Sequence, residues 1–184
     1  MTRIISGTVG GRKLRVPPAG TRPTADRVRE ALFSVLASRI DFEGLRVLDL
    51  YAGSGALGLE ALSRGAAHAR LVESDGRAAA VITRNITELG LTGASVSKAS
   101  VATLLAAPPD DPYDLVLSDP PYDLPNSAVE ADLLALLAGG WLAADALTVV
   151  ERSVRTPPID WPDGFDSPRR RDYGETRIEL AERT

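Results

Sequence analysis

The chain has 184 residues, of which 44% are hydrophobic and 25% are charged, an ordinary balance for a soluble globular protein. It has no cysteine and a single histidine, so disulfides and thiol chemistry are excluded and no metal site is expected. No apolar run approaches the length of a membrane span, and the first residues lack the apolar core of a signal peptide. These features favour a cytoplasmic protein.

Positive charge is concentrated in the first 40 residues, which carry eight arginine and lysine residues against two acids, although the whole chain has a net charge of −4. A basic arm on an acidic body indicates a polyanionic partner for the arm. The alternative is a solvated charged face with no ligand.

A β-hairpin is predicted at the N-terminus, where Arg3–Val9 and Arg12–Val16 flank the pair Gly10-Gly11. Two strands alone are marginally stable in water, so this hairpin must lean on the body or become ordered on its partner. We therefore divide the chain into a basic extension, residues 1–20, and a body, residues 21–184. Deleting the extension is expected to leave the body folded.

A helix is predicted from an N-cap at Thr24 to about Leu36. Its apolar residues at helical spacing are Val28, Ala31, Leu32, Val35 and Leu36. That arrangement leaves Arg22, Arg27 and Arg29 to face solvent or a ligand.

Strict alternation of strand and helix patterns begins at Leu45 and indicates a parallel sheet with helices on both faces. A closing hairpin adds one antiparallel strand, so the fold class is α/β, Rossmann-like, with seven mostly parallel strands. The predicted strands are 46–50, 69–73, 94–98, 114–118, 147–152, 169–173 and 176–181, and the predicted helices between them are 56–64, 76–89, 101–106 and 129–138.

A glycine-rich turn follows the first strand of this alternation. Gly53, Gly55 and Gly58 satisfy the G-x-G-x-x-G pattern of dinucleotide sites, which is a weak signal when taken alone. Glu73 ends the next strand, 20 residues after Gly53, where a carboxylate accepts hydrogen bonds from a ribose diol. Asp49, at the end of the first strand, would repel a pyrophosphate and suits a cationic ligand. This favours S-adenosylmethionine over NAD.

The tetrapeptide Asp119-Pro120-Pro121-Tyr122 follows the fourth strand of the body. Ligands of open α/β sheets bind at the carboxyl ends of the strands, where this tetrapeptide must lie. The two prolines stiffen the backbone, so an acid and fixed carbonyl groups form a cluster of hydrogen-bond acceptors beside a flat aromatic ring. Such a cluster predicts a site that grips the exocyclic amino group of a nucleobase and holds it against a methyl donor.

Asp49–Gly55 together with Asp119–Tyr122 resemble the class I S-adenosylmethionine-dependent amino-methyltransferases. Further stretches, Thr21–Thr24, Arg27–Phe33 and Tyr173–Thr176, resemble the RsmD family, which methylates N2 of one guanine in 16S ribosomal RNA. The resemblance implies a cofactor site for S-adenosyl-L-methionine and a catalytic site around the tetrapeptide. The cofactor residues would be Asp49, Tyr51, Ala52, Gly53, Ser54, Gly55, Glu73, Ser100, Val101 and Asp119, and the catalytic residues Asp119, Pro120, Pro121 and Tyr122.

The partner implied by the resemblance is 16S ribosomal RNA, in small ribosomal subunit particles, bound by a monomer. Its phosphates would dock mainly on Arg3, Arg12, Lys13 and Arg15 of the extension, and Arg22, Arg27 and Arg29 would line the route to the pocket. One departure is Ser100, which stands where such enzymes often place an acid for the adenine of the cofactor. Three alternatives stay open: an adenine-N6 methyltransferase acting on DNA or RNA, a non-catalytic RNA-binding protein, and an NAD oxidoreductase.

Overall fold

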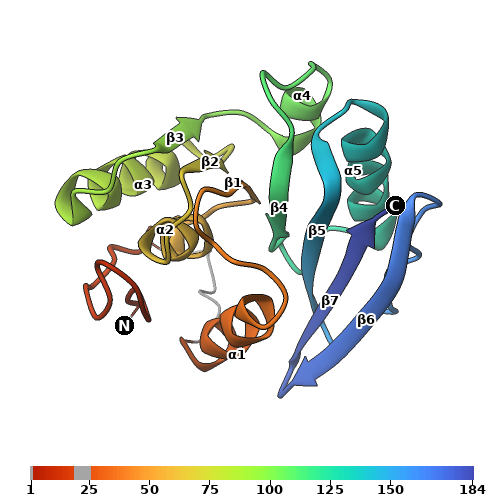
Figure 1. Cartoon of the computed structure of the whole chain (residues 1–184), viewed down its shortest axis with the longest axis horizontal. Coiled ribbons are helices and arrows are strands. Elements are labelled where there is room, and N and C mark those ends of the chain that lie inside the picture. Colours follow the sequence, from red (N-terminus) through yellow and green to blue (C-terminus); the bar gives the residue numbers. More distant parts are fainter. Residues whose placement is uncertain (1, 19–25) are drawn as a thin grey trace.

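The computed structural model describes residues 2–18 and 26–184. A seven-stranded sheet runs through the molecule in the strand order β3-β2-β1-β4-β5-β7-β6 (Figure 1). The elements are α1 (Asp26–Ala37), β1 (Arg46–Leu50), α2 (Ala56–Ser63), β2 (His68–Val72), α3 (Gly76–Leu89), β3 (Ala94–Ser97), α4 (Val101–Leu105), β4 (Tyr113–Ser118), α5 (Asn126–Ala138), β5 (Leu142–Ser153), β6 (Phe165–Tyr173) and β7 (Thr176–Arg183).

Strand directions agree with the sequence-based prediction. β3, β2, β1, β4 and β5 pair in parallel, and β7 pairs antiparallel with both β5 and β6. β7 is therefore the one antiparallel strand, and the predicted fold class is confirmed. The largest difference in bounds is β5, which begins at Leu142, five residues before the predicted start. Asp145, with φ of 59°, interrupts the alternation of buried and exposed residues along β5, so the sequence pattern does not reveal the first part of the strand.

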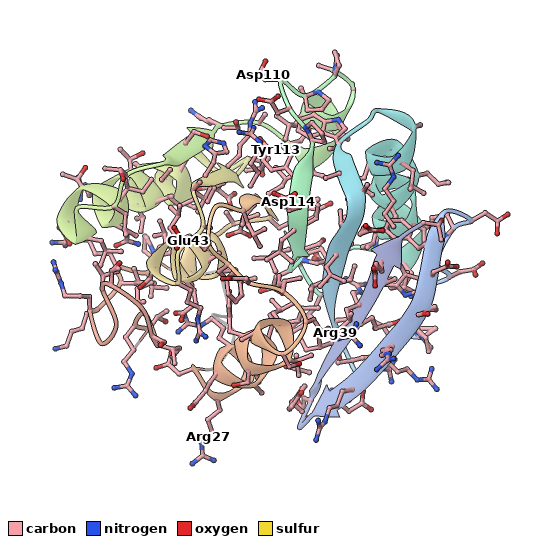
Figure 2. All side chains as sticks on the ribbon, in the orientation of Figure 1. Arg27, Arg39, Glu43, Asp110, Tyr113 and Asp114 are labelled. Atoms are coloured by element: carbon pink, nitrogen blue, oxygen red, sulfur yellow. The ribbon has the colours of Figure 1, made fainter. Side chains whose placement is uncertain are left out.

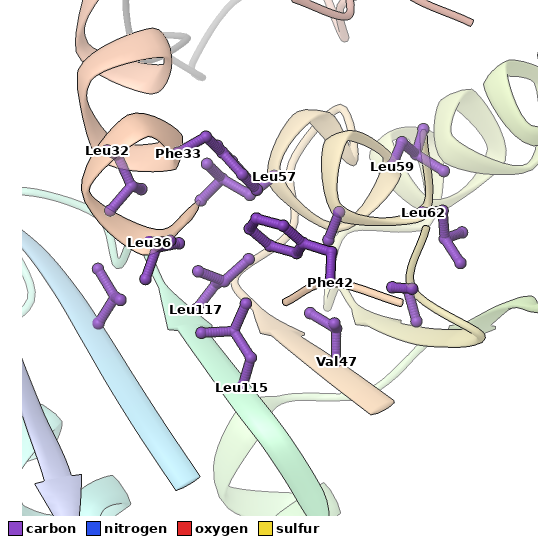
Figure 3. Close-up of a cluster of buried hydrophobic side chains, with 14 of the residues drawn as sticks. Leu32, Phe33, Leu36, Phe42, Val47, Leu57, Leu59, Leu62, Leu115 and Leu117 are labelled. Carbon is purple, nitrogen blue, oxygen red and sulfur yellow. The ribbon is translucent and has the colours of Figure 1, made fainter. Parts of the chain in front are cut away.

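Two apolar clusters cover the two faces of the sheet. On one face, α1 and α2 pack against β1 and β4; Figure 3 shows Phe33 and Phe42 facing Leu115 and Leu117. On the other face, α4 and α5 enclose Trp141, whose ring stacks on Tyr113 at 6.0 Å. With helices on both faces, the carboxyl ends of the parallel strands are left as the place for a ligand.

The N-terminal segment, residues 2–16, forms a much shorter pairing than the predicted hairpin: the amides of Ile4 and Leu14 donate to the carbonyl oxygens of Arg12 and Thr2, both at 2.9 Å. One bridge, between Arg3 and Lys13, is its only strand pairing within the described residues. The chain between them leaves the ladder to bind α2, because the amides of Ile5 and Ser6 donate to the carboxylate of Glu60 at 2.7 and 3.1 Å. The predicted pairing stops at Ile4 because the Glu60 carboxylate accepts from the next two N–H groups, those of Ile5 and Ser6.

Two side chains of the N-terminal segment belong to the core of the body. Ile4 is 0% exposed and Leu14 is 6% exposed, and both lie in the same apolar cluster as α1 and α2. Gly7, with φ of 88°, lies so close to α2 that a Cβ atom would come within 1.8 Å of the Ser63 carbonyl oxygen. The division into an extension over 1–20 and a body over 21–184 stays a prediction.

Candidate active site

A cavity of about 510 Å³ opens at the carboxyl ends of β1, β2 and β4, a volume in the usual range for small-molecule sites. The structure brings eleven predicted site residues together in its wall, and two others, Asp49 and Gly55, do not line it. The eleven are Tyr51, Ala52, Gly53, Ser54, Glu73, Ser100, Val101, Asp119, Pro120, Pro121 and Tyr122.

The turn after β1 is held open by unusual backbone angles. Tyr51, Gly53 and Gly55 have φ values of 61°, 60° and 83°, in the left-handed region that favours glycine. A Cβ atom on Gly55 would also lie 3.0 Å from the Leu71 side chain on β2. Gly55 therefore lets α2 pack closely on the sheet, whereas Gly53 contributes to the cavity wall itself.

Asp49 lies behind this turn, almost fully buried. Its Oδ2 atom accepts a hydrogen bond from the Gly58 amide of α2 at 2.9 Å, and its Oδ1 atom has no partner among the described residues. Burial raises the pKa of Asp49 to about 8; the Gly58 hydrogen bond opposes this shift, and the charges of Asp119 and Glu73 add to it. A nearby cation would therefore favour the ionised carboxylate.

Glu73 lies in the cavity wall just after β2, oriented by two backbone donors. Its Oε2 accepts from the Gly53 amide at 2.9 Å and its Oε1 accepts from the Asp75 amide at 2.8 Å. A carboxylate has about four acceptor positions, so each oxygen keeps capacity for a hydroxyl of a ligand. This geometry fits the predicted contact with a ribose diol.

Ser100 and Val101 begin α4 at the same wall. The Ser100 hydroxyl accepts from the Thr103 amide at 3.1 Å and so caps the helix, and Val101 is buried at its first turn. Since the Ser100 side chain serves the cap, the groups that remain for a flat ligand at this end are the backbone and the Val101 side chain.

The tetrapeptide Asp119–Tyr122 lines the same cavity at the end of β4, on the other side of β1 from Glu73, which follows β2. Asp119 is half-buried and Tyr122 is exposed, with 42% of its surface accessible. Pro120 is buried beneath them, so the acid and the ring project from a backbone that the prolines stiffen. An acceptor and an aromatic face therefore stand together at the cavity, as the sequence predicts.

Arg152, near the end of β5, was not predicted and holds this loop in place. Its guanidinium donates to the side-chain oxygen of Asn126 at 3.1 Å and to the carbonyl oxygens of Pro121 at 3.3 Å and Leu124 at 2.5 Å. Burial lowers the pKa of Arg152, while the charge of Asp119 opposes that shift, so the arginine and the acid attract each other. An arginine that ends an apolar strand was the available signal in the sequence.

Tyr51 is the second residue whose role was missed, because its partner comes from a distant helix. Its hydroxyl lies 2.5 Å from Oδ2 of Asp132 on α5, a residue 81 positions later in the chain. Burial raises the pKa of Tyr51, and burial likewise raises the pKa of Asp132. This pair ties the glycine-rich turn to α5, the helix that follows the Asp119–Tyr122 tetrapeptide.

Most of the predicted RNA-binding side chains contact the body of the protein itself. Arg3 pairs with Asp26 at 3.4 Å, and Arg12 and Arg15 both donate to Glu88 of α3. Lys13 and Arg27 are exposed, and Figure 2 shows Arg27 pointing outward from the start of α1. Arg22 lies outside the described residues.

Arg29 does not face solvent as expected, because α1 is rotated relative to the predicted apolar face. Leu32, Phe33 and Leu36 are buried, and Arg29 precedes them at helical spacing, 0% exposed. One of its nitrogens donates to Asp26 at 2.5 Å and to the Arg3 carbonyl at 2.7 Å. Arg29 therefore anchors the N-terminal segment to α1 and also contributes to the cavity wall.

Neither a metal centre nor a membrane span is found in residues 2–18 and 26–184. Their acidic and histidine side chains form no group of three or more that could bind a metal ion. None of their helices combines the length and the apolar character needed to cross a membrane.

Comparison with known proteins places the chain in a family. The family model described as Conserved hypothetical protein 95 matches residues 2–182. Ribosomal RNA small subunit methyltransferase D of Escherichia coli K12 is 43% identical over 164 residues, which are 86% of this chain and 80% of that protein. The enzyme of the same name from Haemophilus influenzae is 39% identical over 86% of this chain and 84% of that protein.

Solved structures share the fold of this chain. A hypothetical protein from Thermus thermophilus is 35% identical, has a TM-score of 0.83 and is covered over 99% of both chains. A magnesium protoporphyrin IX methyltransferase from Synechocystis PCC 6803, solved with bound S-adenosylmethionine, has a TM-score of 0.66 at 15% identity, over 90% of this chain and 87% of that one, and so shares the fold alone. The chain therefore belongs to the Conserved hypothetical protein 95 family, the RsmD family of ribosomal RNA methyltransferases.

Proposed function

We propose that this protein, a small-subunit ribosomal RNA methyltransferase by its family, transfers the methyl group of S-adenosylmethionine to N2 of one guanine in 16S ribosomal RNA. The observation that carries the proposal is the placement of Asp119 and the Pro120 backbone in the same cavity as Glu73, on the other side of β1. Acceptors on one side suit a base amino group, and the acid on the other side suits the ribose of the donor.

The residues around the cavity fit S-adenosylmethionine. Glu73 is oriented for a ribose diol, and the volume of about 510 Å³ suits a ligand of that size. The Oδ1 atom of Asp49, which has no partner in the part of the chain that the structure describes, is a buried acceptor beside the turn, where a cationic ligand would favour its ionised form. Val101 and the glycine-rich turn supply apolar and backbone surface between these acids.

The chain's own residues act by orientation and electrostatics. The bound donor supplies an already activated methyl group. Asp119 and the Pro120 carbonyl would accept from the hydrogens of the guanine amino group, which localises the lone pair on N2 and stabilises the positive charge that develops there as the donor's carbon–sulfur bond breaks. Asp119 or water would then take the proton that N2 releases. Tyr122 offers its exposed ring to the base, which must leave its stack to enter the cavity.

The same proposal includes the form of the RNA substrate, the cellular compartment and the oligomeric state. The substrate is the small ribosomal subunit particle in the cytoplasm, and the enzyme acts as a monomer. The names of the relatives support small-subunit ribosomal RNA as the substrate, and the assembled particle is the further step that we propose. Methylation of purified particles and of naked RNA by a gel-filtered monomer tests both points; preference for naked RNA, or activity confined to a dimer fraction, would refute them.

Replacement of Asp119 tests the chemistry. Asp119→Ala should depress single-turnover methylation by about 10²-fold, as loss of a transition-state hydrogen-bond partner does, and leave cofactor affinity nearly unchanged. Asp123→Ala is the matched control, since Asp123 is a neighbouring exposed acid of the same cavity wall. The labelled RNA is then digested to nucleosides. Wild-type rates in Asp119→Ala would refute the mechanism, and N6-methyladenosine as the product would establish the alternative.

A further inference from the structure

The outermost strand of the sheet carries cations that have no acidic partner in the described part of the chain. Arg169, Arg170 and Arg171 of β6 are all exposed, and none takes part in a salt bridge there. Other arginines near this hairpin are paired: Arg177 with Asp172 at 3.0 Å and Arg155 with Glu175 at 3.1 Å. Three consecutive exposed cations on a molecule of net charge −4 call for a functional explanation.

Two of these side chains share one face of the sheet. Arg169 pairs with Leu180 and Arg171 pairs with Ile178, both members of the apolar cluster that also contains α1. Directly paired residues lie on the same face of a sheet, and alternate residues of a strand return to that face. Arg170 therefore faces the other way, opposite Glu179.

The pairing register places Arg171 level with the catalytic loop. Arg171 pairs with Ile178, and Ile178 pairs with Glu151 of β5. The residue before Glu151, Val150, pairs with Ser118, the last residue of β4, so Asp119 follows at the height of Arg171. β6 is three strands away from β4, which is roughly 14 Å, the axial length of about four nucleotides of a helical strand.

We propose that Arg169 and Arg171, here called the β6 arginine face, bind backbone phosphates of the ribosomal RNA whose target base enters the cavity. A guanidinium matches a phosphate with two parallel hydrogen bonds, and the position at the height of Asp119 suits nucleotides that flank the flipped base. The proposal rests on RNA as the substrate but not on which atom is methylated. It also explains where an otherwise acidic protein attracts RNA once Arg3, Arg12 and Arg15 are engaged by its own body.

A pair of double variants tests the β6 arginine face. Arg169→Gln with Arg171→Gln removes two charges from β6, and Arg77→Gln with Arg84→Gln removes two exposed charges from α3 as the control. Binding of small-subunit RNA is measured from low to high salt. The β6 variant should lower the slope of log K against log salt by about 1.4–1.8, the value for two lost phosphate contacts, while the α3 variant leaves the slope unchanged.

Other outcomes would overturn the proposal. Equal slopes in both variants would mean that only overall charge matters. Self-association of the β6 variant at an unaltered slope would mean that these arginines merely keep an edge strand from pairing with other chains. This test is independent of the proposed chemistry. A β6 variant that binds RNA weakly can still be given saturating RNA, and the methylated nucleoside that it produces can then be identified.

Discussion

A single buried carboxyl group links the stability of the free protein to its cofactor site. The pKa of Asp49 is raised to about 8 in the folded protein from an ordinary value of 3.8. Between these two values the folded state holds a proton that the unfolded state has released. The free energy of unfolding therefore falls as pH rises from about 4 to about 8. Burial of the ionised Asp49 carboxylate therefore destabilises the free protein, and a cationic ligand bound nearby would reduce this cost.

Asp49→Asn should remove this pH dependence. The stability of the variant relative to the wild type should rise by up to about 1.4 kcal/mol per pH unit between pH 5 and 8, since one proton is involved. Affinity for S-adenosylmethionine should fall because the negative charge is gone. Urea unfolding at several pH values and calorimetric titration measure the two effects. Parallel stability curves for the variant and the wild type would contradict the assignment.

Arg152 holds the loop that carries the proposed catalytic residues through its planar guanidinium group. Arg152→Lys keeps the charge but not the simultaneous bonds to the Pro121 and Leu124 carbonyls, so the loop should loosen. Misplacement by about 1 Å costs about 10²-fold in rate, so single-turnover methylation should fall by up to that factor while cofactor affinity changes little. Arg155→Lys, which alters an exposed arginine three residues later, is the control. A wild-type rate in Arg152→Lys would show that charge alone suffices.

At the scale of elements, the N-terminal segment has a closer contact with the body of the protein than the sequence predicts. Its basic residues predict a docking arm that the body does not need. The structure packs Ile4 and Leu14 into the core and pairs Glu60 with two of its amides. Fully burying an aliphatic side chain contributes about 1.5–3 kcal/mol, so the packing of Ile4 and Leu14 stabilises the fold whatever the segment does with RNA.

Ile4→Ala should therefore destabilise the protein by about 2–5 kcal/mol, the range for truncation of a fully buried aliphatic side chain. Val16→Ala is the matched control, since Val16 belongs to the same segment but is 37% exposed. Thermal and urea unfolding measure the difference. If Ile4→Ala unfolds with the wild-type midpoint, the segment is only loosely held and the docking-arm interpretation regains its basis.

At the scale of the molecule, most of the fold could be predicted from local patterns. The bounds of β1 and α3 agree residue for residue with the prediction, because an apolar run and a capped amphipathic pattern are complete within themselves. The glycine-rich turn and the tetrapeptide were placed at one cavity because parallel strands end at the same edge of a sheet.

What the sequence did not predict depends on contacts between distant positions. The hydroxyl of Tyr51 meets Asp132 across 81 positions, and Arg152 reaches back 28 positions to Leu124. The burial of Arg29 depends on the rotation of α1 about its own axis where it packs on the sheet. Val28 and Arg29 both lie at the boundary of the apolar face of this helix, so the sequence pattern does not decide which of them is buried. Pairings of this kind follow from tertiary packing and leave no local periodicity to detect.

The docking of residues 2–16 also sets an order of events during synthesis. Glu60, Ser63, Asn85 and Glu88, which hold this segment, follow it by 54 to 76 positions. This segment cannot dock until α3 has been synthesised, because Asn85 and Glu88 belong to that helix. During that interval the apolar side chains of Ile4 and Leu14 stay exposed, because the core that buries them has not yet formed.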